Sequence, residues 1–125
     1  MPVKVVDASA VSALLFAERD AEEIANRIRG HSLASPALLT FEVASVCLKK
    51  MRRHPARKTL LLAAYSLLSR MEIAETAVDG SEVVVFAEHR GLTVYDADYL
   101  WLAQKLGAEL VTLDKKLSKV AKEVP

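Results

Sequence analysis

Short apolar runs alternate with longer amphipathic stretches along this chain. The short runs predict four strands, at residues 3–6, 31–35, 71–75 and 109–113. Between them, apolar residues recur at helical spacing and predict helices at residues 9–17, 21–29, 39–53, 59–70, 81–90 and 96–106, with a short one at 115–122. Strands separated by helices favour a parallel sheet covered on both faces. We therefore predict a three-layer α/β/α fold with right-handed connections.

Particular residues mark where these helices begin, end and face the core. Gly30, Gly91 and Gly107 each follow a periodic stretch, as expected of residues that end a helix. Ser81 is a candidate N-cap for the helix at 81–90. In the helix over 39–53 one side is charged and the other apolar, and the apolar side is predicted to face the core: Phe41, Ala44, Cys47, Leu48 and Met51.

Length and composition fit one globular domain over residues 1–125, with 52% hydrophobic and 26% charged residues. Lys and Arg number 17 against 16 Asp and Glu, so a polyanion would have to be bound by a local patch. The single cysteine excludes an intrachain disulfide, and three scattered histidines give no zinc-site spacing. No targeting signal or membrane-length apolar stretch is present, which predicts a soluble cytoplasmic protein without a membrane partner.

Two aspartates stand where predicted strands end. Asp7 closes the first apolar run, "VKVVD", and Asp114 closes the last, "ELVTLD". In open parallel sheets the functional crevice lies beyond the carboxyl ends of the strands, so both carboxyl groups are expected at that edge. Either aspartate alone is equally consistent with a turn or a helix start, where acidic side chains bond to nearby backbone amides. Their joint placement is what favours a functional site.

The stretch "YDADYLWLA" supplies two further aspartates on one predicted helix. On a helical wheel Asp96 shares a face with Tyr99 and points inward, whereas Asp98 falls on the opposite side with Lys105. Asp96 can serve both as the N-cap of this helix and as a crevice residue. Asp98 is predicted to face away and to act only on the helix dipole. Tyr99 and Trp101 are interpreted as packing or partner-contact residues.

Glu42, in "LLTFEVASV", lies in the first turns of the helix over 39–53 and in line with Lys49 and Arg53. By itself it is typical of a solvated surface glutamate. Four converging carboxylates would repel one another by about 4 kcal/mol per close pair at an effective dielectric near 20, unless cations held them together. All-oxygen ligands suit magnesium or manganese. The acids therefore predict a divalent metal site.

The ordered segments "VVDAS", "LLTFEV", "TVYDADYLWLA" and "LVTLD" resemble the PIN domain family, and at this length the VapC-like toxin of a VapBC-type toxin–antitoxin pair. The resemblance spans about residues 3–117 and implies a metal-dependent endoribonuclease. It assigns catalytic, metal-holding roles to Asp7, Glu42, Asp96 and Asp114. Ser9 and Thr112 match small hydroxyl positions beside the first and last acids. The chain departs from the family pattern at Asp98, where small or apolar residues are common, and in having little length for a final edge strand.

The acids predict metal-assisted attack of water on a phosphodiester bond, with one or two Mg²⁺ or Mn²⁺ ions as cofactor, and the family resemblance implies that the substrate is RNA. Attack by water would leave 5′-phosphate and 3′-hydroxyl ends. An acidic pocket needs flanking cations to hold RNA, and the segment "KKMRRHPARK" supplies them. Lys49 and Arg53 are the candidate RNA contacts, about 10 and 16 Å from Glu42 along the helix axis. The same segment is equally consistent with a solvated helix end.

Other function classes fit less well. A phosphate-accepting receiver domain or a dehalogenase-type phosphatase needs paired acids after the first strand, and "VVDAS" has one. No Gly-rich phosphate loop, GxSxG elbow or GxGxxG motif is present. An RNA-processing nuclease without an antitoxin and a non-catalytic RNA-binding or partner-binding module remain as alternatives.

Two partner proteins are also predicted. The helix "TLLLAAYSLL" is apolar almost all round, more than one buried face consumes, which predicts a homodimer. The family resemblance implies a small antitoxin protein in addition. An inserted Arg or Lys of that partner would block the acidic pocket by replacing the cation.

Overall fold

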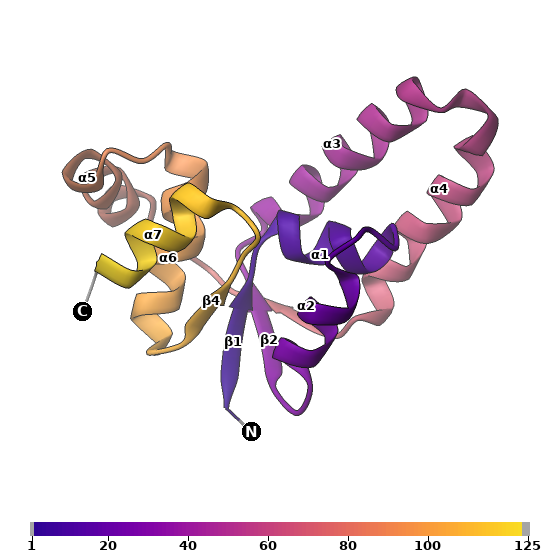
Figure 1. Ribbon diagram of the computed structural model, residues 1–125. Helices are drawn as coiled ribbons and strands as arrows, with labels where there is room; N and C mark the ends of the chain where they lie inside the picture. The colour runs from indigo at the N-terminus through magenta and orange to yellow at the C-terminus, as the bar shows by residue number, and fades with distance from the viewer. Residues whose placement is uncertain (1, 124–125) are drawn as a thin grey trace.

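The computed structural model describes residues 2–123, which form a four-stranded parallel sheet flanked by helices (Figure 1). The strands are β1 (Val3–Val6), β2 (Ser32–Ser35), β3 (Ile73–Glu75) and β4 (Glu109–Val111). The α-helices are α1 (Ala8–Leu15), α2 (Ala21–Ile28), α3 (Leu38–Arg53), α4 (Lys58–Ser66), α5 (Gly80–Arg90), α6 (Val94–Leu106) and α7 (Lys115–Glu123). Two short 3₁₀ helices are η1 (Pro55–Arg57) and η2 (Leu67–Arg70). The predicted three-layer α/β/α fold is confirmed.

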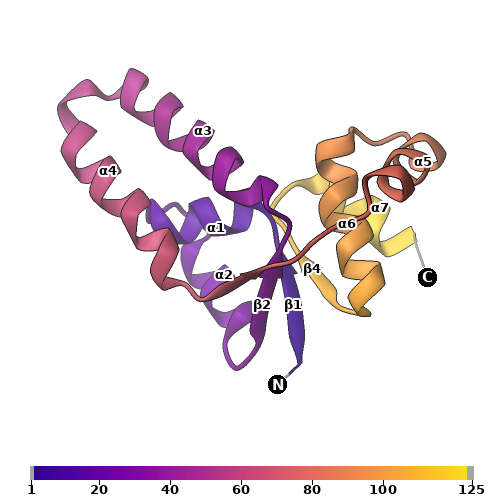
Figure 2. The ribbon, with the colours of Figure 1, turned by 180° about the vertical axis from the view of Figure 1, so that it is seen from behind.

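The strand order β3-β2-β1-β4 determines which helices cover which face of the sheet. The chain moves outward from β1 through β2 to β3 and then returns to β4, on the far side of β1. Right-handed crossovers place the helices between β1 and β3 on one face of the sheet and the helices between β3 and β4 on the other. Accordingly α1, α2 and α3 belong to one face, and α5 and α6 to the other. Figure 2, seen from behind, shows the segment that leads from β3 to α5 passing on the near side of the other strands.

Most helix boundaries lie within two residues of the prediction, and the exceptions have local causes. Gly91 and Gly107 adopt left-handed backbone conformations with φ of 64° and 61°, so each ends its helix as expected of glycine. The helix predicted over 59–70 narrows to 3₁₀ geometry from residue 67. The predicted Ser81 cap is wrong, because Asp79 accepts the hydrogen bond from the Glu82 amide.

The predicted buried side of α3 is also wrong in part. Leu39, Val43 and Cys47 face the core, whereas Phe41 is 74% exposed and Leu48 is 44% exposed. The reason is tertiary: α3 packs against α1 on one side and α4 on the other, so its buried stripe is set by those neighbours. Figure 1 shows α3 and α4 running side by side away from the sheet. Glu42 is half-buried as a result.

The core lies between the sheet and the helices on both faces. Val5 and Val6 of β1 and Val111 of β4 are fully or almost fully buried. β4 forms one edge of the sheet within residues 2–123, pairing with β1 in a register that sets Val6 beside Val111. This register brings the ends of β1 and β4 together. In the described part of the chain, no helix is both long and apolar enough to span a membrane.

Candidate active site

Asp7 lies at the carboxyl end of β1 and is only 5% exposed. It is the N-cap of α1, since its Oδ1 accepts a hydrogen bond of 3.0 Å from the Ala10 amide. The Ser9 hydroxyl donates to the same oxygen at 2.7 Å, and the Thr112 hydroxyl donates to Oδ2. Asp7 is thus both a helix cap and a carboxylate whose two oxygens are fixed in space.

A chain of hydrogen bonds joins Asp7 to the loop that follows β4. The Ser9 Oγ accepts from the Leu113 amide at 2.8 Å, and the Thr112 Oγ1 accepts from the Asp114 amide at 3.0 Å. Asp114 in turn caps α7, accepting a bond of 2.9 Å from the Leu117 amide. The structure therefore brings four of the predicted residues together across more than a hundred positions of sequence: Asp7, Ser9, Thr112 and Asp114.

Glu42 and Asp96 come from the two helical layers. Glu42 Oε1 accepts a hydrogen bond of 2.6 Å from the Tyr99 hydroxyl, which links α3 to α6. Tyr99 is 2% exposed, so this hydroxyl is held in the core beside the site. The sequence predicts only packing or a partner contact for Tyr99. Its place on the same helical face as Asp96 is the signal that could have identified its role at the site.

Asp96 is half-buried and lies in the first turn of α6. The predicted N-cap role is wrong, because Thr93 is the N-cap and its Oγ1 accepts from the Asp96 amide at 3.1 Å. The side chain of Asp96 is therefore free of the capping role that its sequence position suggested. Burial raises the pKa of this carboxyl most, and the charges of Asp114 and Asp7 raise it further.

The four predicted acids share one electrostatic neighbourhood. Burial is the largest cause that raises the pKa of Asp7, Glu42 and Asp96 above ordinary values. The acids also act on one another: the Asp114 charge raises the pKa of Asp7, and the Asp96 and Asp7 charges raise the pKa of Glu42. Hydrogen bonds from Thr112, Ser9 and the Ala10 amide partly offset the effect at Asp7. This arrangement disfavours four negative charges without a cation.

Asp98 does not face away as the helical wheel predicts. It is half-buried, and burial raises its pKa. Burial is the largest cause that raises the pKa of Glu42 and of the Tyr99 hydroxyl, and the Asp98 charge adds to it at both groups. The helical wheel gives directions around α6 alone. Glu42 comes from α3 and lies close enough to interact with both Asp98 and Tyr99. Asp98 therefore borders the acidic site.

The chemistry of these side chains fits a hard divalent cation. Within residues 2–123, no three His, Cys, Asp or Glu side chains are already arranged as a coordination group. Mg²⁺ does not need such a cage, since it keeps several waters and binds through one or two carboxylates together with a substrate phosphate. The four acids offer carboxylate oxygens, the ligand type that Mg²⁺ and Mn²⁺ prefer. Asp7, Glu42, Asp96 and Asp114 could hold such an ion.

The cations predicted to contact RNA lie apart from these acids. Lys49 and Arg53 are exposed and follow Glu42 along α3 by about 10 and 16 Å. They belong to the part of α3 that runs away from the sheet (Figure 1). Their neighbour Lys50 is engaged in an ion pair with Glu18. RNA contact by Lys49 and Arg53 stays a prediction.

Several known proteins resemble this chain in sequence or in fold. The PIN domain family model matches residues 4–123. Ribonuclease VapC3 of Pyrobaculum aerophilum is 32% identical over 120 residues, covering 92% of this chain and 92% of that protein. Ribonuclease VapC9 of Mycobacterium tuberculosis is 33% identical over 118 residues, covering 91% and 87%. The crystal structure of PAE2754 from Pyrobaculum aerophilum has a TM-score of 0.76 and 28% identity, covering 95% of this chain and 84% of that one.

Proposed function

Since the chain belongs to the PIN domain family, we propose that it is a metal-dependent endoribonuclease, the VapC-like toxin of a type II toxin–antitoxin pair. The observation that carries the proposal is Asp7, a nearly buried carboxylate fixed by three hydrogen bonds and surrounded by three further acids. A purely structural helix cap does not need that surrounding charge. A site for a divalent cation does.

The proposed mechanism assigns roles to this chain's own residues. Asp7, Glu42, Asp96 and Asp114 hold one or two Mg²⁺ or Mn²⁺ ions. When bound, such an ion lowers the pKa of water and neutralises charge on the scissile phosphate. Ser9 and Thr112 orient Asp7, and Tyr99 orients Glu42 by hydrogen bonding. Because water is the nucleophile, the RNA 2′-hydroxyl is not consumed, and the products carry 5′-phosphate and 3′-hydroxyl ends.

A cleavage assay with matched variants tests this mechanism. The wild-type protein is expected to cut RNA with Mg²⁺ or Mn²⁺, to stop with chelator, and to leave 5′-phosphate ends. Asp7→Asn should abolish cutting while the protein stays folded by circular dichroism. Asp79→Asn is the matched control, because Asp79 caps α5 as Asp7 caps α1. Cutting that continues in chelator or in the Asp7→Asn protein would contradict the metal role, and binding of RNA without cutting would favour the non-catalytic module.

We also propose a homodimer that uses the exposed apolar side of α3 and α4. Phe41, Leu60 and Leu62 are exposed, and Leu61 is the one buried residue of α4 within the described chain. A hollow between the two helices has an apolar lining, formed by Ala44, Cys47, Leu48, Met51, Leu62 and Tyr65. Exposed apolar area of this kind is typical of a partner surface. Light scattering should show a dimer at high micromolar concentration, and Leu60→Glu with Leu62→Glu should give a monomer.

The proposed antitoxin would inhibit by placing an Arg or Lys among the acids. Metal and antitoxin would then compete for the same charge. Purification from the native host is expected to recover a small partner protein. Millimolar Mn²⁺ should weaken the binding of this partner to the chain. A partner that is recovered but binds equally well to the wild type and to Asp7→Asn would contradict inhibition through the acidic site. Recovery of no partner would favour an RNA-processing nuclease.

A further inference from the structure

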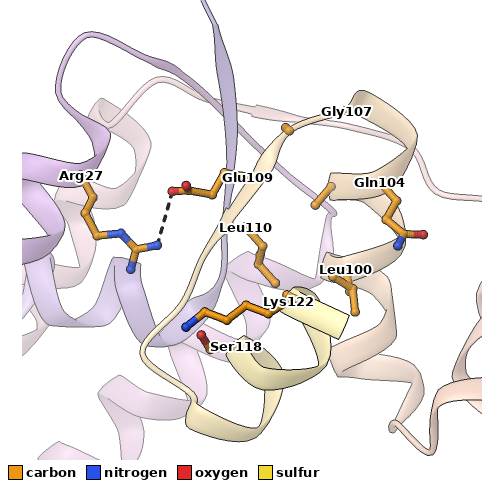
Figure 3. Close-up of a pocket in the computed structure, with 11 residues that line it drawn as sticks. Arg27, Leu100, Gln104, Gly107, Glu109, Leu110, Ser118 and Lys122 are labelled. Carbon is orange, nitrogen blue, oxygen red and sulfur yellow. Dashed lines mark hydrogen bonds and ion pairs between the residues drawn. The ribbon is translucent and has the colours of Figure 1, made fainter. Parts of the chain in front are cut away.

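A hollow of about 640 Å³ lies beside β4, between α6, α7 and α2. Figure 3 shows Leu100 and Gln104 on the α6 side, and Arg27 on the opposite side of β4. A second hollow, of about 380 Å³, shares Arg27, Ser118 and Lys122 with the first. The second hollow is also lined by Thr112 and Asp114. The two hollows are therefore adjacent and are together called the α2–α7 groove here, and the smaller one is lined by two residues of the acidic site.

The cations of this groove lie in a row. Lys115, Lys119 and Lys122 recur at helical spacing on one side of α7, over about 10 Å along its axis. Arg27 of α2 faces them across the groove, and Figure 3 shows the Lys122 side chain extending past Ser118 toward that side. Within residues 2–123, none of the three lysines is ion-paired with an acid. Their positive charges are therefore available to a polyanion.

The acids of the groove do not cancel this charge. Glu109 is paired with Lys4 at 3.3 Å and with Arg27 at 3.4 Å. Burial alone would raise the pKa of Glu109, but hydrogen bonds and charges from these two cations lower it. Asp114 belongs to the acidic site itself and would face the metal. Glu23 is the remaining acid among the lining residues.

The larger hollow adds a compartment of a different character. Beside the cations, two polar side chains line it, from Gln104 and Ser118. The rest of the wall is mostly apolar and is formed by Leu100, Ala103, Ala108, Leu110 and Ala121. A cationic rim beside an apolar wall fits a nucleotide, whose phosphate is charged and whose base has an apolar face. A base can enter such a compartment only from an unpaired strand, because the bases of a duplex are stacked inside.

We propose that the α2–α7 groove binds the single-stranded RNA that extends from the cleavage site, with its phosphates on Lys115, Lys119 and Lys122. This inference rests on the proposed ribonuclease function and adds the course of the substrate. It differs from the prediction of RNA contact at Lys49 and Arg53, which lie on the projecting part of α3. The competing occupant is a protein strand added to β4, the edge of the sheet. The lysine row favours RNA, because backbone pairing to a strand needs no cations.

The test is RNA binding without cleavage. Fluorescence anisotropy with a single-stranded oligoribonucleotide is measured in chelator at several salt concentrations, for the wild type and for Lys119→Gln with Lys122→Gln. Removing one phosphate-binding cation should reduce the magnitude of the slope of log K against log salt by about 0.7. The double variant should therefore reduce it by about 1.4 and bind RNA about tenfold more weakly. Arg70→Gln with Lys105→Gln removes equal charge from exposed positions outside the groove and should leave slope and affinity unchanged.

Other outcomes separate the groove from the proposed function. If the double variant binds RNA with wild-type affinity and slope, the groove proposal is overturned, while cleavage by the metal-loaded wild type still supports the ribonuclease. Equal weakening by Lys49→Gln with Arg53→Gln, and none by the α7 pair, would move the RNA to α3. RNA carrying 4-thiouridine next to the cut should cross-link to peptides from residues 100–122. Cross-links confined to α3 and α4 would overturn the proposal independently of affinity.

Discussion

The two halves of the acidic site are built differently. In the strand half, Asp7 receives bonds from two hydroxyls and an amide, and those hydroxyls are themselves bonded to the loop after β4. In the helix half, Glu42 is half-buried and has one hydrogen bond within residues 2–123, from Tyr99. The strand half is thus fixed before any ligand binds, whereas Glu42 and Asp96 keep freedom to adjust. Substitutions in the strand half should therefore affect both stability and activity.

Thr112→Val is expected to have the largest effect among substitutions outside the four acids. It removes the hydroxyl that donates to Asp7 and accepts from the Asp114 amide. Leaving these buried groups without a partner should cost about 1–3 kcal/mol of unfolding free energy. Loss of a group that orients a metal ligand should lower cleavage about 10- to 100-fold. Denaturant unfolding and RNA cleavage measure the two effects.

Thr59→Val is the control for this prediction, since Thr59 is exposed on α4. Thr59→Val should change the free energy of unfolding and the rate of RNA cleavage only slightly. If Thr112→Val kept wild-type cleavage, the claim that the strand half must be fixed in advance would be wrong.

Tyr99→Phe tests the helix half and should have a smaller effect. It removes the one hydrogen bond to Glu42, which lowers the pKa of that carboxyl, so the pKa of Glu42 should rise further. Cleavage should fall about tenfold and recover in part at higher pH, where Glu42 is again ionised. Stability should change less than in Thr112→Val, because Glu42 can still reach water. Tyr95→Phe, at an exposed tyrosine on the same helix, is the control.

The contrast between the two halves also explains what could be predicted from sequence. Asp7 and Asp114 follow from the rule that parallel strands end at the same edge of the sheet, whereas Ser9 and Thr112 are expected only from the family resemblance. The bond between Tyr99 and Glu42 joins two helices that approach each other only in the folded chain. The pattern of apolar and polar residues within one helix does not indicate which residue of another helix will lie next to it.

The same reasoning accounts for the errors at Asp98 and along α3. A helical wheel gives directions around one helix axis but not which neighbour lies in each direction. The wheel predicts that Asp98 faces away, yet α3 brings Glu42 near it. The apolar pattern predicts that Phe41 is buried, yet the packing of α1 and α4 leaves it exposed.

The stability of the metal-free protein should depend on pH in a defined direction. The pKa of Asp7 and Asp96 in the folded state lies above the ordinary value of 3.8, and that of Glu42 above 4.5. Between the ordinary and the raised values the folded state binds more protons than the unfolded chain, so stability falls as pH rises. Thermal unfolding in chelator should show a lower Tm at pH 7 than at pH 5.

Two comparisons sharpen this pH prediction. Saturating Mn²⁺ should raise Tm more at pH 7 than at pH 5, because the carboxylates must be ionised to bind metal. Asp7→Asn should show a shallower dependence of Tm on pH in chelator. A Tm that rose from pH 5 to 7 without metal would show that the acids do not oppose one another in the folded state.

Asp98→Asn should have the smallest effect. Its charge acts on Glu42 through space without a hydrogen bond to it. Interactions between partly exposed charges are weak, so kcat/KM should change by less than about threefold. A loss as large as that of Tyr99→Phe would instead place Asp98 among the residues that hold metal.

The central claim is that the two halves of the site hold one divalent cation centre together. Titration of Mn²⁺ into the RNA-free protein by calorimetry, with electron paramagnetic resonance of the free ion, measures this directly. The wild type and Asp79→Asn should bind one or two ions with equal affinity. Asp7→Asn from the strand half and Glu42→Gln from the helix half should each bind at least about tenfold more weakly, because each removes a charged ligand. Equal Mn²⁺ binding by all four proteins would contradict the claim.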